Sequence, residues 1–106
     1  MANPTIYRII FRNQDEVYEM YARFVAESDM FGFLAVEEFI FGENTTLVID
    51  PSEERLKLEF SRVKRTFIPL HLIERIDEVD KQGIGKIKHL GEKQPKVSLF
   101  PLPEKR

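Results

Sequence analysis

The chain has 106 residues, of which 42% are hydrophobic and 32% are charged, with a formal net charge of −2 at pH 7. This length predicts one domain, and the composition is that of an ordinary soluble globule. Because the sequence has no cysteine, disulfides, thiolate catalysis and cysteine-ligated metal sites are excluded. The N-terminus lacks a signal-peptide pattern, and no apolar run approaches the ~20 residues that span a bilayer. We therefore expect a cytoplasmic protein that does not contact the membrane.

The first predicted element is a β-hairpin. Two β-rich runs, 6–11 and 17–25, flank a polar turn cluster at 12–16. A helix is the alternative for 17–25, because its apolar residues also fit a 3.6-residue period. If the run is a strand, alternation gives it one better core face: Tyr18, Met20, Ala22 and Phe24.

The next run, 31–41, is apolar on both faces of a strand. Such a strand is either covered by a helix or buried in a subunit interface. We expect a hairpin in which the run 45–49 returns beside 33–41. We also expect a homodimer that buries part of one aromatic set: Phe31, Phe33, Phe39 and Phe41.

A helix over 51–61 has the clearest local signal. Asp50 is a strong N-cap, Pro51 suits the first helical position, and Glu53 completes the spacing of a capping box. Leu56, Phe60 and Val63 form its expected buried stripe.

Two strands, 63–69 and 72–79, follow the helix and are separated at Pro69, which cannot continue a strand ladder. Many small SH3-like and Sm-like barrels close with such a strand, turn and strand. The expected fold is therefore α+β and mainly antiparallel. It is a small, bent SH3-like or Sm-like barrel of about six strands, with one helix inserted near 51–61. An open antiparallel sheet with the helix on one side is the alternative.

We expect a single globular domain over 1–80 and a mobile tail over 81–106, with 97–102 as its one apolar patch. The tail carries seven basic and two acidic residues, a net charge of +5, whereas 1–80 carries nine basic and sixteen acidic, or −7. A solvated tail is the simpler interpretation. An arm for an anionic partner, nucleic acid included, is the functional alternative.

One group of side chains is a candidate patch for an anionic ligand: Arg62, Lys64, Arg65, His71 and Arg75. Phosphates would suit such a patch, with neighbouring aromatic rings available to stack on bases. The simpler interpretation is that these cations complement the helix C-terminus and that the histidine contacts its own turn. The sequence has no metal-ligand spacing, nucleophile elbow or phosphate-binding fingerprint, so we expect no metal, cofactor or catalytic residue.

Residues 31–42, 48–54 and 64–71 resemble a family of small proteobacterial proteins catalogued only as a domain of unknown function. The resemblance covers roughly 5–80 and implies a bacterial cytoplasmic protein, without lending any catalytic residue. The expected function is a non-enzymatic interaction or regulatory module that binds another protein or itself. An RNA- or DNA-binding accessory role, using the basic cluster at 62–65 and the tail, is the alternative.

Overall fold

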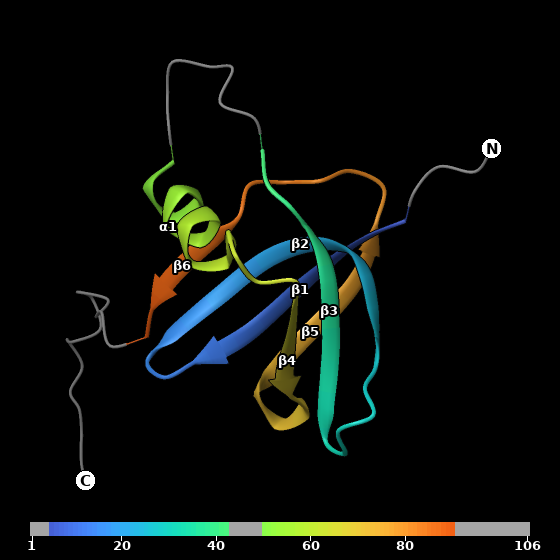
Figure 1. Ribbon diagram of the computed structural model, residues 1–106. Helices are drawn as coiled ribbons and strands as arrows, with labels where there is room; N and C mark the ends of the chain where they lie inside the picture. Colours follow the sequence, from blue (N-terminus) through green and yellow to red (C-terminus); the bar gives the residue numbers. More distant parts are fainter. Residues whose placement is uncertain (1–4, 43–49, 91–106) are drawn as a thin grey trace, which may run out of the picture.

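A six-stranded antiparallel sheet and one helix make up the computed structural model, which describes residues 5–42 and 50–90. Figure 1 shows α1 and β6 at one end of the molecule and the turn between β2 and β3 at the other. The elements are, in chain order, β1 (Ile6–Asn13), β2 (Glu16–Glu27), β3 (Phe33–Ile40), α1 (Pro51–Phe60), β4 (Arg65–Pro69), the 3₁₀ turn η1 (Leu70–Leu72), β5 (Ile73–Val79) and β6 (Lys86–His89).

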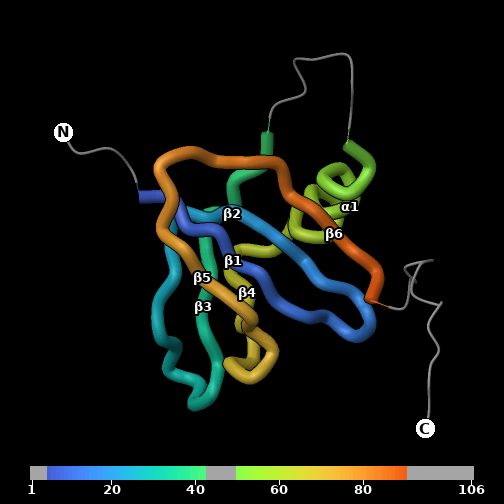
Figure 2. Tube along the Cα trace, turned by 180° about the vertical axis from the view of Figure 1, so that it is seen from behind, coloured from blue at the N-terminus to red at the C-terminus, as the bar shows by residue number. Residues whose placement is uncertain are grey.

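The strands follow the order β4-β3-β2-β1-β5, and β6 pairs with β2 beside this path. The long strand β2 pairs with three other strands. Its first half pairs with β1 on one side and β6 on the other, and its second half pairs with β3. In Figure 2 the segment after β5 crosses to α1 before it enters β6. The sheet stays open, because β4 and β5 stand at its two ends and are not paired with each other, so the predicted closed barrel is not what forms.

The predicted first hairpin is confirmed, and 17–25 is strand rather than helix. Gln14 and Asp15 connect the strands, with Gln14 at a positive φ of 61° that suits the tight turn. The predicted strand 33–41 forms β3, while its predicted partner 45–49 lies outside the described residues. The strands predicted at 63–69 and 72–79 are β4 and β5, and η1 forms the break between them.

In β2 and β3 the inward and outward positions of the side chains alternate, and this alternation shifts by one residue at Arg23 in β2 and Glu38 in β3. Glu38 has a positive φ of 60°, and the Arg23–Glu38 step is missing from an otherwise regular ladder. Tyr18, Met20 and Ala22 are buried as predicted. Beyond the irregularity, Val25 packs on the core and Phe24 turns outward, so the predicted core position of Phe24 is wrong.

The core lies between the concave face of the sheet and α1. Leu56 of the helix is fully buried there against strand residues such as Ile9, Tyr18 and Val36. Phe60 extends the contact, with its ring centroid 5.0 Å from that of Phe39. Burial of these side chains, each contributing roughly 1.5–3 kcal/mol, is the main force that holds α1 on the sheet.

The start of α1 is capped as predicted, but the capping box does not form. The Asp50 side chain accepts hydrogen bonds from the backbone N–H groups of Ser52 and Glu53 at 2.9 and 3.3 Å. The Glu53 carboxylate is buried and instead accepts from the backbone N–H groups of Gly42 and Gly85, at 3.1 and 3.0 Å. One carboxylate therefore fastens the end of β3 and the approach to β6 onto the helix.

The structure differs from the predicted boundary between a domain at 1–80 and a tail at 81–106. Lys86–His89 form β6, and Gly83 and Gly85 are in tight contact with the body. A Cβ atom on Gly83 would lie 2.5 Å from the hydroxyl of Tyr21, and one on Gly85 would lie 2.8 Å from Leu56. Residues 81–90 therefore belong to the domain, while 91–106 lie outside the described residues.

Candidate functional site

The strand β4 presents an edge that no described strand covers, because it ends the sheet. The register with β3 decides which backbone groups face that edge. The N–H of Leu70 donates to the carbonyl of Gly32 at 2.8 Å, in line with the β3–β4 ladder. Hydrogen-bonded pairs recur every second residue, so Thr66 and Ile68 bond to β3, and Arg65 and Phe67 direct their N–H and C=O groups to the free edge.

A second bond supports this assignment from the other side of β3. The N–H of Ser28 donates to the carbonyl of Phe33, in line with the β2–β3 ladder. The odd-numbered residues of β3 therefore bond to β2, which leaves Leu34 and Val36 for Ile68 and Thr66. The free edge of β4 thus carries two outward N–H donors and the carbonyl of Pro69, which has no N–H.

The outer face of β4 borders a hollow of about 340 Å³, which we name the outer hollow. Its floor is the pair Ala26 and Ala35 on neighbouring strands, whose small side chains leave space between larger ones. Its walls include Phe24, Met30 and Phe67, which are 44%, 44% and 37% exposed. Such a concentration of exposed apolar side chains is typical of a binding surface.

The rim of the outer hollow is acidic. Glu27, Asp29 and Glu37 line it together with one cation, Arg65. Arg65 donates to Glu37 at 2.8 Å, and this hydrogen bond raises the pKa of the guanidinium. The charges of the lining therefore sum to −2, which favours a partner with basic side chains.

The other face of β4 borders a hollow of about 310 Å³, which we name the inner hollow. It lies between β4, η1, the end of β1 and the end of α1. Its lining comprises Phe11, Arg12, Asn13, Tyr18, Glu59, Phe60, Val63, Thr66, Phe67, Ile68, Pro69 and Leu72. The Tyr18 hydroxyl donates to Glu59 at 2.7 Å; the pKa of Tyr18 is raised, first by burial and then by this carboxylate. The inner hollow is thus largely apolar, and the hydrogen bond from buried Tyr18 to exposed Glu59 fixes one polar contact in its lining.

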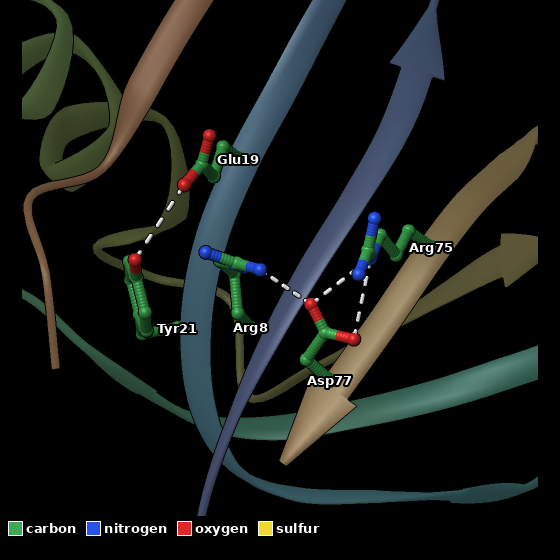
Figure 3. A network of polar contacts seen from close by, with 5 residues as sticks. All are labelled: Arg8, Glu19, Tyr21, Arg75 and Asp77. Carbon is green, nitrogen blue, oxygen red and sulfur yellow. Dashed lines mark hydrogen bonds and ion pairs between the residues drawn. The ribbon is translucent and has the colours of Figure 1, made fainter. Parts of the chain in front are cut away.

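A separate polar network joins β1, β2 and β5 on the face opposite the core (Figure 3). Arg8 lies between Tyr21 and Asp77 in the ladder and donates to Asp77, and Arg75 donates to the same carboxylate at 3.1 Å. The hydrogen bond from Arg8, followed by that from Arg75, lowers the pKa of Asp77. Because the carboxylate is satisfied by two cations, we assign this network to strand pairing.

The predicted anionic patch is not assembled into one site. Arg62, Lys64 and Arg65 are exposed near the start of β4. His71 lies in η1 beyond the far end of β4, a strand of five residues or about 13 Å. Arg75 lies on β5 at the opposite end of the sheet and binds Asp77.

The four phenylalanines of the predicted self-association surface also separate. Phe31 is 99% exposed in the turn between β2 and β3, and Phe33 is half-buried. Phe39 and Phe41 are partly buried against the core instead. Sequence reasoning missed Met30 in the turn between β2 and β3 and Phe67 on the edge strand β4, which both line the outer hollow.

Two further findings concern the described ranges 5–42 and 50–90. They contain no group of three or more His, Cys, Asp or Glu side chains placed to hold a metal ion. No helix within them is both long enough and apolar enough to cross a membrane.

The fold and this edge define a small antiparallel sheet domain with an uncovered edge strand between two hollows. The chain belongs to the family described as "Domain of unknown function (DUF1820)", whose profile matches residues 5–102. This match confirms the resemblance to a domain of unknown function. No curated protein and no solved structure matches the chain.

Proposed function

We propose that this protein is a non-enzymatic interaction module that binds an extended segment of a protein partner along the free edge of β4. One observation carries the proposal: the outward backbone groups of Arg65 and Phe67 lie between a hollow on each face of the strand. A strand added there gains main-chain hydrogen bonds. Its alternate side chains meet the two hollows, the arrangement by which sheet edges recognise peptides.

The finer description of the fold belongs to the same proposal. We infer that the domain is an open relative of the SH3-like and Sm-like barrels. The succession of β4, the η1 turn and β5 supports this, as does the strongly bent β2. We also propose that the protein is bacterial and works in the cytoplasm, as expected from the sequence.

The nucleic-acid alternative has less support. Arg65 is engaged by Glu37 and Arg75 by Asp77, and the predicted cations are spread over both ends of the sheet. A second copy of the chain is another partner that the sequence suggests, and it would use the fully exposed Phe31.

The experiment is a selection of random 12-residue peptides for binding to the full chain, followed by NMR mapping of the best binder. We expect its largest amide shifts at Arg65 and Phe67. Phe24→Ser and Phe67→Ser should each weaken binding by at least about tenfold, since each removes an apolar wall. The matched control is Leu58→Ser on α1, which removes a 76% exposed apolar side chain outside both hollows and should leave binding unchanged.

Three results would count against this function. Binders could map elsewhere, or Leu58→Ser could weaken binding as much as the hollow variants. Tight binding of single-stranded RNA or duplex DNA that persists near physiological salt would instead favour the nucleic-acid alternative. Sedimentation of the full chain at high micromolar concentration tests self-association.

A further inference from the structure

We propose that the chain's own C-terminal segment binds intramolecularly along the free edge of β4, with residues 96–100 paired beside Arg65–Pro69. This inference rests on the proposed edge-binding function and names a regulator of that edge. A partner would then have to displace the segment in order to bind. Four observations support it. They are the position of the last described residue near the inner hollow, the strand-like pattern of 96–100, the opposite charges of the segment and the outer hollow, and the family match that extends through residue 102.

The chain reaches the end of its described part close to the inner hollow. The N–H of Leu90 donates to the carbonyl of Asp15 at 2.7 Å, at the turn between β1 and β2. Asn13 is two residues from Asp15, at most about 7 Å along the chain. Asn13 also lines the inner hollow together with residues 66–69 of β4. Five residues can span at most about 17 Å when fully extended, so a connection of the length of 91–95 is long enough for the next residues to cross the inner hollow to β4.

The sequence after this connection has the pattern of a short strand. Residues 96–100 read Lys-Val-Ser-Leu-Phe and are bounded by Pro95 and Pro101. Proline removes a ladder donor and limits a strand at both of its ends. The stretch between the prolines has five residues, the same number as β4. Alternation places Val97 and Leu99 on one face, suited to the largely apolar inner hollow.

The other face suits the outer hollow. Lys96, Ser98 and Phe100 share it, so a cation and an aromatic ring would lie on the side of the acidic rim and of the exposed aromatic walls. Residues 93–103 contain two lysines and no acidic residue, whereas the charges of the outer hollow sum to −2. Opposite charges favour this pairing at physiological salt, because the groups would lie within a Debye length of ~8 Å.

The family match includes the proposed strand. It extends through residue 102, beyond both prolines, so the segment belongs to the matched domain. A short connection gives the segment an effective concentration in the millimolar range at the edge. Covering the edge in this way also protects a sheet end from pairing with other chains.

The test is residue-resolved amide hydrogen exchange of the full chain by NMR. The backbone amides of Arg65 and Phe67 should be protected if the segment pairs with the edge. The double variant Val97→Asp/Leu99→Asp should raise their exchange rates at least about tenfold, since it places two charges against an apolar hollow. Leu102→Asp, a single leucine-to-aspartate change outside the paired stretch, should leave both rates as they are, whereas Leu99→Asp alone should raise them.

The strand itself provides internal controls. The amides of Thr66 and Ile68 bond to β3, so they should stay protected in every variant and show that β4 is intact. Unprotected Arg65 and Phe67 amides in the native chain, or protection that the double variant leaves unchanged, would overturn the inference. Protection that rises between about 50 µM and about 1 mM protein would also overturn it, because the segment would then come from a second copy.

The outcome separates this inference from the proposed function. If the amides of Arg65 and Phe67 exchange rapidly, the intramolecular strand does not form, and the edge remains available to a separate protein partner. Protected amides without any selected peptide binder would support the intramolecular strand and count against recognition of a separate protein.

Discussion

Replacing Glu53 should be among the most destabilising single changes on α1. Its carboxylate is only 6% exposed and accepts from the backbone N–H groups of Gly42 and Gly85. In Glu53→Ala both donors lose their acceptor. The N–H of Gly85 is buried and bears the full cost of an unsatisfied donor, roughly 1–3 kcal/mol, while that of Gly42 is partly accessible to water and loses less. We therefore expect a loss of about 2–4 kcal/mol in the free energy of unfolding.

Glu53→Gln separates charge from hydrogen bonding. The amide keeps one oxygen that can accept from one glycine, but its NH₂ group would then face the other N–H. The expected loss is about 1–2 kcal/mol, smaller than that of the alanine variant. The assay is urea unfolding followed by fluorescence of the tyrosines and by circular dichroism. Glu78→Gln is the charge-matched control on β5, where the side chain is exposed, and it should change stability by less than about 0.5 kcal/mol.

One result would refute this reasoning. If Glu53→Ala costs less than about 0.5 kcal/mol, water must satisfy both glycine amides at little cost, and the carboxylate does not fasten β3 and β6 to the helix. Equal losses for the alanine and glutamine variants would show that the negative charge matters and that the two accepted bonds do not.

Three further changes test other parts of the fold. Asp50→Ala should cost ~0.5–2 kcal/mol in urea unfolding and Asp50→Asn much less, because asparagine also caps; equal losses would give the carboxylate another role. Gly85→Ala should cost about 1–3 kcal/mol, since the new Cβ would lie 2.8 Å from the buried Leu56, and an unchanged urea midpoint would contradict this contact. Asp77 has a lowered pKa in the folded state, so its stabilising contribution is present above its unfolded pKa and is lost as pH falls through the folded one. Stability curves from pH 7 to pH 2 should therefore fall less steeply below about pH 4 in Asp77→Asn than in the native chain, and parallel curves would show that the bond from Arg8 contributes nothing.

The elements predicted correctly from sequence are those with a local cause. A polar turn cluster separates β1 from β2, Asp50 and Pro51 start α1, and Pro69 ends β4, so neighbouring residues suffice to define each boundary. These signals act over a few residues through backbone dihedrals and hydrogen bonds to nearby N–H groups. They remain visible whatever the rest of the chain does.

Features that depend on distant partners could not be predicted from the sequence. Lys86–His89 is short and polar and forms a strand because the first half of β2 offers an edge, where Glu19 lies opposite Lys86 and Glu16 opposite His89. Whether β4 and β5 meet depends on how the whole sheet bends.

The candidate site depends on the same tertiary arrangement. The outward position of Phe24 follows from the bend near Arg23 and Glu38, and the outer hollow requires Ala26 and Ala35 to meet across two strands. Glu53 was predicted to bond to its own helix, and its true partners are 11 and 32 residues away. Sequence patterns report the periodicity of a segment, whereas an uncovered edge is defined by which strands fail to pair, and that is decided only when the complete sheet has formed.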